Sequence, residues 1–183
     1  MATLFWVLII ILIILVLYII ISYNRLITLR NRIENAWSQI NVQLKRRYDL
    51  IPNLVEIVKG YAKHEKETFK MVTEARSKLI TGSLSDRAKA SDMITNALKS
   101  IFAVAEAYPK LMANENFKML QEELSGTESK IAYSRQFYND SVMEFNILIQ
   151  KFPTNIISNM FNFKEREFFK TEGKEKEPIK VKF

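Results

Sequence analysis

An uninterrupted apolar run near the N-terminus constrains the fold of this chain more than any other feature. From Leu4 to Ile21 every side chain is apolar except for the hydroxyl of Tyr18. A helix needs about 20 such residues to cross the hydrocarbon core of a bilayer, so the run predicts a membrane-spanning helix. Residues 1–3 precede it without the positive charge that begins a signal peptide, which favours a retained anchor over a cleaved leader.

The residues around the run indicate how the helix would sit in a bilayer. Trp6 and Tyr18 suit the two interfacial aromatic belts, although they would serve equally well as apolar filler. Arg25, Arg30 and Arg32 follow the run, and no charged side chain precedes it. By the positive-inside rule we expect a single-pass protein of the cell membrane, with a short N-terminus outside and its body in the cytoplasm. The residues that mark the expected span are Leu4, Trp6, Tyr18 and Ile21.

The remainder of the chain predicts long helices. The 183 residues include only four glycines and four prolines, which are too few turn residues for a multi-stranded sheet. Apolar side chains recur at three- and four-residue steps over residues 26–44, 55–79 and 88–105. Because no glycine or proline separates the apolar run from the first stripe, we expect the spanning helix to continue into the soluble part.

Turn and capping residues predict where these helices end. We expect the first soluble helix to end after Lys45-Arg46-Arg47 and a second to begin at Asp49, with Pro52 in its first turn. Thr81-Gly82 supplies the next stop, and Ser83 to Asp86 resembles a capping box. A third helix then runs to Tyr108-Pro109, because the residue before proline is disfavoured in helical geometry.

The fourth predicted helix has the clearest period in the chain. Its apolar residues stand seven apart, as in a coiled coil, and are Phe117, Leu124, Ile131, Tyr138, Phe145 and Phe152, with Asn114 as the predicted cap. Short connections favour antiparallel neighbours, so the sequence predicts an all-α fold in which a transmembrane helix precedes an up-down-up-down four-helix bundle. The expected divisions are an anchor over residues 1–22, the bundle over 23–152 and an aromatic, basic segment with its tail over 153–183.

The segment after the fourth helix has two interpretations. Residues 152–169 read FPTNIISNMFNFKEREFF, in which apolar and charged side chains are interleaved. Such a segment could lie in the membrane interface. It could equally fold over the open end of the bundle, so contact with lipid and a capping role both stay open for residues 155–169.

Charge and composition narrow the classes of partner and chemistry. The net charge is +7, but Lys45-Arg46-Arg47 lies roughly 35 Å along the helix from Ile21. That distance exceeds the Debye length of about 8 Å, so we expect these cations at a helix end and not on the same bilayer. We expect no nucleic-acid partner. Docking of an acidic partner by Lys45, Arg46 and Arg47 is the alternative.

Sequence tests for catalysis are negative. The chain contains no cysteine, which excludes disulfides, thiolate metal ligands and a cysteine nucleophile. Its single histidine is His64. Tyr61 stands where a Glu-x-x-His di-iron motif needs glutamate, and Thr68 where a zinc-protease motif needs its second histidine. No phosphate-binding glycine loop occurs. We therefore expect no catalytic residue, metal site or cofactor.

The chain resembles the LemA family of bacterial membrane proteins. The resemblance is carried by residues 23–77, which begin YNRLITLRNRIENAW, by residues 87–124 and 128–142, and by FPTNIISNMFNFKEREFF. It implies an N-terminal anchor and an α-helical bundle, in agreement with the patterns above. It implies no catalytic residue.

Our leading hypothesis is a non-enzymatic scaffold that self-associates into a membrane-bound homo-oligomer. The motivating features are an anchor without polar groups and an aromatic surplus that one bundle does not need. The candidate contact residues are Trp37, Tyr133, Phe137, Tyr138, Phe161, Phe163, Phe168 and Phe169. The alternative is an adaptor or regulator that docks on a membrane protease or signalling complex and so has a membrane-protein partner.

Overall fold

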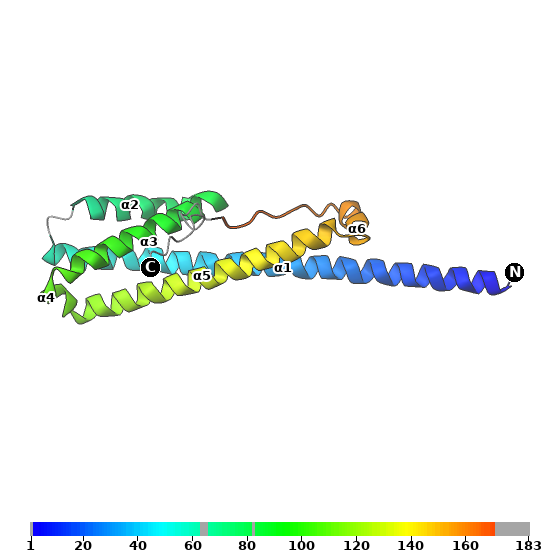
Figure 1. The fold of residues 1–183 in the computed structure, drawn as a ribbon, viewed down its shortest axis with the longest axis horizontal. Helices are drawn as coiled ribbons and strands as arrows, with labels where there is room; N and C mark the ends of the chain where they lie inside the picture. The colour runs from blue at the N-terminus through cyan, green and yellow to red at the C-terminus, as the bar shows by residue number, and fades with distance from the viewer. Residues whose placement is uncertain (1, 63–65, 82, 171–183) are drawn as a thin grey trace, which may run out of the picture. The chain divides into compact units, whose positions relative to one another are not determined.

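The computed structural model describes residues 2–62, 66–81 and 83–170, and these residues form helices, connections and one extended segment (Figure 1). The helices are α1 (Ala2–Tyr61), α2 (Lys66–Thr81), α3 (Leu84–Glu106), α4 (Pro109–Met112), α5 (Glu115–Gln150) and α6 (Thr154–Met160). These ranges contain no strand. The prediction of an all-helical chain with an apolar N-terminal helix is confirmed.

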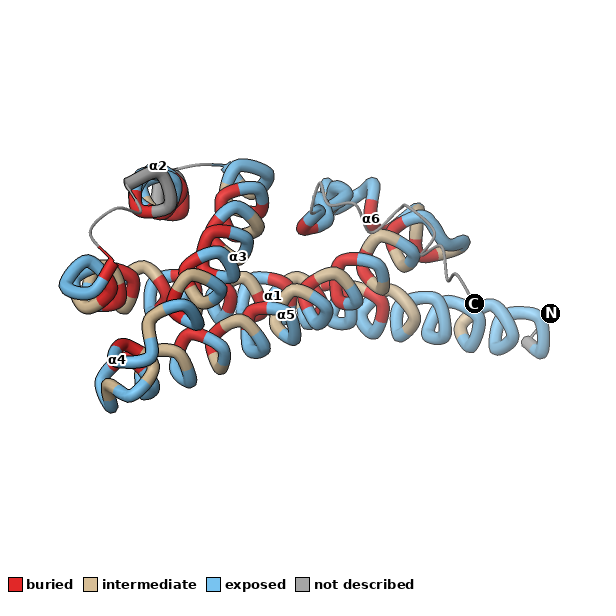
Figure 2. The backbone as a smooth tube through the Cα atoms, turned by 60° about the vertical axis from the view of Figure 1, so that its left-hand side comes forward, coloured by how far each residue is buried: buried red, intermediate tan, exposed pale blue. Residues whose placement is uncertain are grey.

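Helix α1 carries the apolar run into the polar part of the chain without a break. The apolar part is long enough to cross a membrane, and none of it is buried within the chain. Figure 2 shows most of this part of α1 in the colour of exposed residues. Burial begins at Ser22, and Leu26 and Leu29 are fully covered. The helix therefore continues through residues 22–29, as the sequence predicts.

The predicted break between residues 47 and 52 is wrong, because α1 continues to Tyr61 with Pro52 inside it. A proline within a helix has no N–H to donate to the carbonyl of the residue four positions earlier. Here that carbonyl belongs to Tyr48, and Arg76 of α2 donates its Nε–H to it over 3.1 Å. The Arg76 guanidinium also lies 3.8 Å from the centre of the Tyr48 ring. A neighbouring helix thus supplies the hydrogen bond that the proline removes.

The helix predicted from Asp49 to Thr81 is divided, since α1 ends at Tyr61 and α2 begins at Lys66. The predicted ends at Thr81, Ser83, Tyr108 and Asn114 are confirmed. Ser83 caps α3, and its side chain and that of Asp86 each accept a hydrogen bond from the other's backbone N–H. The Ser83 hydroxyl also donates to Asp86 Oδ2 over 2.7 Å, and this bond, together with that from the Ser83 backbone N–H, holds the pKa of Asp86 below its usual value. Asn114 Oδ1 accepts from the backbone N–H of Phe117, 3.1 Å away, at the start of α5. The short helix α4, which begins at Pro109, was not predicted.

The chain divides into two compact units. The anchor unit comprises residues 1–38 and 136–168, and the helical unit comprises residues 39–135 with residue 169 onward. The division into an anchor over residues 1–22, a bundle over 23–152 and a C-terminal segment over 153–183 stays a prediction.

Each unit has its own apolar core. The helical unit buries Ile40, Leu44, Ile51, Leu54, Phe69, Val72, Leu79, Ile94, Leu98, Ile101, Leu111, Phe117, Leu124 and Ile131. The anchor unit buries Leu26, Leu29, Ile33, Tyr138, Val142, Phe145, Ile149 and Ile157. The seven-residue row of α5 is buried from Phe117 to Phe145, whereas Phe152 lies beyond the helix and is exposed.

Candidate functional site

A buried arginine joins three helices of the helical unit. Arg47 of α1 is only 1 % exposed, and its Nη2 is paired with Glu128 of α5. Its Nη1 donates to the Thr95 hydroxyl of α3 over 3.2 Å. Taking a charge out of water is unfavourable unless the charge is paired and hydrogen-bonded. Glu128 and Thr95 meet that requirement for the two Nη groups, whereas the buried Nε has no hydrogen-bond partner among the described residues. Through these two partners Arg47 joins the three helices at one point.

The Thr95 hydroxyl links the two charged groups. Its oxygen lies 2.9 Å from Glu128 Oε2 and 3.0 Å from the carbonyl oxygen of Ser91. A hydroxyl has one proton to donate, so it serves one of these acceptors at a time while accepting from Arg47.

A second ion pair lies in the same unit. Arg135 of α5 is 3.3 Å from Asp92 of α3, and its guanidinium lies 4.9 Å from the centre of the buried Phe169 ring. Burial lowers the pKa of Arg47 to about 10; the positive charge of Arg135 adds to this shift, and Asp92 opposes it. Arg47 therefore stays charged at neutral pH. We call Arg47, Asp92, Thr95, Glu128 and Arg135 the charged junction.

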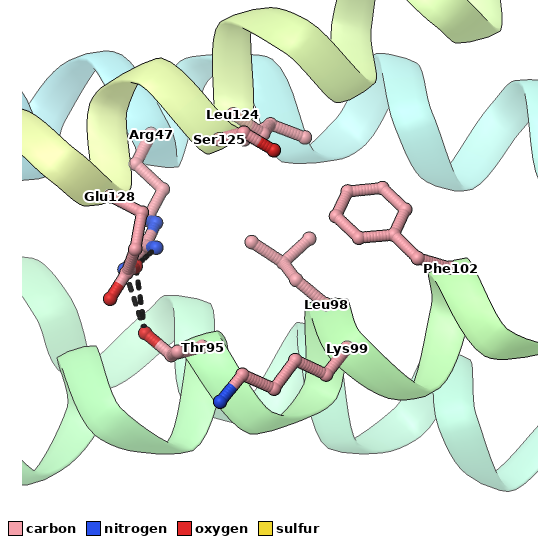
Figure 3. A pocket seen from close by; sticks show the side chains of 8 residues that line it. All are labelled: Arg47, Thr95, Leu98, Lys99, Phe102, Leu124, Ser125 and Glu128. Carbon is pink, nitrogen blue, oxygen red and sulfur yellow. Dashed lines mark hydrogen bonds and ion pairs between the residues drawn. The ribbon is translucent and has the colours of Figure 1, made fainter.

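A cavity of about 200 Å³ opens beside the charged junction (Figure 3). Arg47, Thr95 and Glu128 form one side of it, and the other lining residues are Leu98, Lys99, Phe102, Leu124 and Ser125. Its wall is mostly apolar away from the junction, so its chemistry suits a small apolar group. Sequence reasoning missed this site, because Arg47 reads there as one member of an exposed basic run.

The structure separates the three cations of the predicted docking run. Arg47 is buried, so it is not part of an exposed surface, and this part of the prediction is corrected. Arg46 pairs with Glu123 of α5, and Lys45 lies 3.4 Å from Asp49, one turn along α1. The helical period explains the difference, since consecutive residues point about 100° apart around a helix. A docking role for Lys45 and Arg46 stays a prediction.

The candidate contact aromatics also fall into two groups. Tyr138 and Phe169 are buried, and Trp37 and Phe163 are half-buried. Trp37 packs on Tyr138 with ring centres 6.0 Å apart, and Phe163 lies 6.2 Å from Phe145. The exposed members are Tyr133, Phe137, Phe161 and Phe168. Only these four present an accessible ring to a partner.

The segment after α5 packs within the anchor unit. Helix α6 is tied to α1 by a 3.0 Å hydrogen bond between the hydroxyls of Thr154 and Tyr18. The chain then turns at Asn162, which has a φ of 56°. The backbone N–H groups of Asn162 and Phe163 donate to Asn159 and Ser158, a Schellman ending with asparagine in the left-handed position.

Residues 163–168 run as an extended strap along α1 and α5. Asn146 of α5 both donates to and accepts from the backbone of Arg166, at 2.9 Å each, and the Tyr138 hydroxyl donates to Glu167 O over 3.0 Å. Burial raises the pKa of Tyr138. Arg166 lies 3.6 Å from Glu34 of α1. The strap therefore covers a face of the anchor unit. Whether residues 155–169 cap the open end of a bundle or contact lipid stays a prediction.

Within the described ranges, no group of three or more His, Asp or Glu side chains could hold a metal ion. His64 lies outside those ranges.

A model of the LemA family matches residues 36–183. The chain belongs to the LemA family. The match begins beyond the apolar run and includes every residue of the charged junction and the strap, so the resemblance found in the sequence is confirmed.

Individual relatives agree with the family match. Magnetosome protein MamQ 2 of Paramagnetospirillum magneticum is 25% identical over 188 residues, which cover 88% of this chain and 69% of the relative. Magnetosome protein MamQ of Magnetospirillum gryphiswaldense is 22% identical, covering 82% of this chain and 65% of the relative. Protein LemA of Metamycoplasma hominis is 31% identical over 140 residues, or 74% of this chain and 63% of the relative. The LemA-family chain thus spans about two thirds of the length of these relatives.

Proposed function

We propose that this LemA-family chain is a non-enzymatic, single-pass membrane scaffold. Helix α1 anchors a four-helix bundle, and the bundle associates with further copies of the chain. The observation that carries the proposal is the continuity of α1, which passes from an exposed apolar run to a buried apolar stripe without a break. The exposed run needs a non-aqueous environment, and the bilayer supplies it. Arg25, Arg30 and Arg32 follow the run, and by the positive-inside rule they support a helical body in the cytoplasm.

The ties within the helical unit support the bundle. Arg76 joins α2 to α1, Arg47 joins α1 to α3, and Arg135 joins α5 to α3. Each of the four helices also contributes buried apolar residues to one core. Short connections between α2 and α3, and between α3 and α5 through α4, favour antiparallel neighbours.

A stripe on the part of α5 that belongs to the helical unit is the proposed contact with a second copy. Met119, Glu122, Gly126, Ser129 and Tyr133 follow one another at three- and four-residue steps, so they share a face of the helix. Met119 and Tyr133 are exposed, the tyrosine by 80%. A Cβ atom added at Gly126 would meet nothing within 4 Å. The middle of the stripe is therefore open to the close approach of another helix.

The test compares two glycine substitutions in the full chain. Gly126→Leu places a bulky side chain in the middle of the stripe, and Gly60→Leu is the matched control, because Gly60 of α1 is equally open. The wild-type protein, extracted with native lipids and examined by mass photometry, should be oligomeric. Gly126→Leu should shift it to monomers without lowering its melting temperature, whereas Gly60→Leu should leave the oligomer intact.

Two results would contradict the proposal. A wild-type chain that is monomeric in both nanodiscs and native-lipid particles would remove self-association altogether. Equal behaviour of the two leucine variants would remove the α5 stripe as the contact.

A further inference from the structure

We propose that α6 lies in the membrane interface and contacts lipid through an apolar face formed by Phe152, Ile156 and Met160. We call this set the α6 face. The inference rests on the anchor of the proposed function but not on self-association. It identifies a second membrane contact, separate from the spanning helix.

The hydrogen bond between Tyr18 and Thr154 sets the depth of α6. The apolar run from Leu4 to Ile21 is about 27 Å long as a helix, close to the hydrocarbon thickness of about 30 Å. Tyr18 lies about one turn from the end of that run. Thr154 is 3.0 Å from the Tyr18 hydroxyl, so the first residue of α6 lies at the edge of the hydrocarbon layer whenever α1 spans it.

The two sides of α6 have different surroundings. Thr154, Ile157 and Ser158 are buried, and they follow one another at the spacing of one helical face. On the other side, Ile156 is 59% exposed and Met160 is 61% exposed, one turn apart. Phe152 lies in the connection that precedes α6 and is 74% exposed. Large apolar side chains gathered in this way mark a contact surface.

Contacts within the anchor unit hold α6 in this orientation. The Ser158 hydroxyl oxygen lies 2.9 Å from the carbonyl oxygen of Ile149 in α5. The Phe161 ring packs on Tyr23 of α1 with ring centres 4.7 Å apart. The α6 face is therefore presented by a helix fixed at both ends.

Continuity with the apolar run identifies lipid as the occupant. Ile20 and Ile21 of α1 are exposed and lie within one turn of Tyr18, so lipid that surrounds them is also adjacent to α6. Lys151 immediately precedes the α6 face and is exposed, as is Lys164 after it. Such lysines reach phosphate groups while the apolar side chains enter the acyl region, to a depth of about 5–10 Å.

The test uses single cysteines, since the chain has none of its own. Met160→Cys carries an environment-sensitive NBD label on the α6 face. Two controls carry the same label: Ile11→Cys within the apolar run and Met93→Cys on the exposed side of α3. Each full-length protein is reconstituted in phosphatidylcholine and phosphatidylglycerol vesicles. The lipids carry a doxyl quencher either near the headgroup or near the end of the acyl chain.

The expected result has a distinct order of depths. The label at residue 160 should show blue-shifted emission and should be quenched more by the shallow than by the deep doxyl group. The label at residue 11 should show the reverse preference. The label at residue 93 should show neither a blue shift nor strong quenching.

Three outcomes would overturn the inference, and they are distinguishable. If residue 11 is quenched but residue 160 is not, α6 lies outside the bilayer and the anchor stands. If neither is quenched, the anchor of the proposed function fails as well. If residue 160 is blue-shifted without doxyl quenching, and the shift disappears as protein is diluted into excess lipid, a second copy covers the α6 face. Circular dichroism of each labelled variant confirms that helix content is retained.

Discussion

Arg47 shows how one side chain can link several helices of the LemA-family chain. Its guanidinium is almost completely buried, and its partners Thr95 and Glu128 come from two other helices. A buried charge that loses its partner is strongly destabilising, whereas replacing the whole pair by apolar groups is often neutral. Replacing Glu128 alone should therefore destabilise the protein more than replacing Arg47 and Glu128 together.

Glu128→Gln should lower the free energy of unfolding by about 3 kcal/mol, at the lower end of the range for broken buried pairs, because the Glu128 side chain is 38% exposed. The double variant Arg47→Met with Glu128→Gln should be more stable than Glu128→Gln alone, since it removes the unpaired charge. Urea unfolding in detergent, followed by circular dichroism, measures both. An unchanged stability in Glu128→Gln would mean that Glu128 does not balance the charge of Arg47.

At the scale of an element, α1 passes through Pro52 because of a contact from another helix. The proline removes one intrahelical hydrogen bond, and Arg76 of α2 donates to the carbonyl of Tyr48 that is left without it. The same guanidinium stacks over the Tyr48 ring. The straight course of α1 in this region is thus a property of α1 and α2 together.

Arg76→Met should lower the free energy of unfolding by about 1.5–3 kcal/mol, the usual range for a hydrogen bond with a charged donor. In a Pro52→Ala background the same substitution should be less damaging by about 1 kcal/mol, because the backbone N–H at position 52 can then serve the Tyr48 carbonyl. The contact between the Arg76 guanidinium and the Tyr48 ring is lost in both backgrounds. The difference between the two losses of stability therefore reports the hydrogen bond to the Tyr48 carbonyl alone. Equal effects in the two backgrounds would show that Arg76 does not compensate for the proline.

At the scale of the whole molecule, the apolar run of α1 and the helical unit have separate roles. No part of the run is buried within the chain, so the core of the helical unit does not depend on it. Tyr18 and Ser22 mark the point at which α1 begins to contact the rest of the anchor unit.

Deletion of residues 1–17 should therefore release the protein from the membrane without unfolding it. After alkaline carbonate extraction of cells, the truncated chain should be found in the soluble fraction and the full chain in the pellet. The melting temperature of the truncated chain should match that of the full chain in detergent. Retention of the truncated chain in the pellet would contradict α1 as the main anchor, and a lower melting temperature would show that the run supports the core.

Local patterns in the sequence determined the helical elements and most of their ends. The apolar run, the seven-residue row of α5, the capping box at Ser83 and the stop at Pro109 depend on neighbours within a few residues. For that reason they could be predicted without knowledge of the fold, and the family resemblance agreed with them.

Only the tertiary structure decided the features that depend on distant residues. From the sequence, Pro52 indicates a helix start, and only the structure shows that Arg76 binds the Tyr48 carbonyl and lets the helix continue. Likewise, the sequence indicates that Arg47 is a surface cation, and only the structure shows that Thr95 and Glu128 bind it in the interior. The strap likewise depends on Asn146 and Tyr138, which bind its backbone and not its side chains. Sequence period reports which face of a helix is apolar, but it does not report which polar group from another helix will satisfy a buried charge or a free carbonyl.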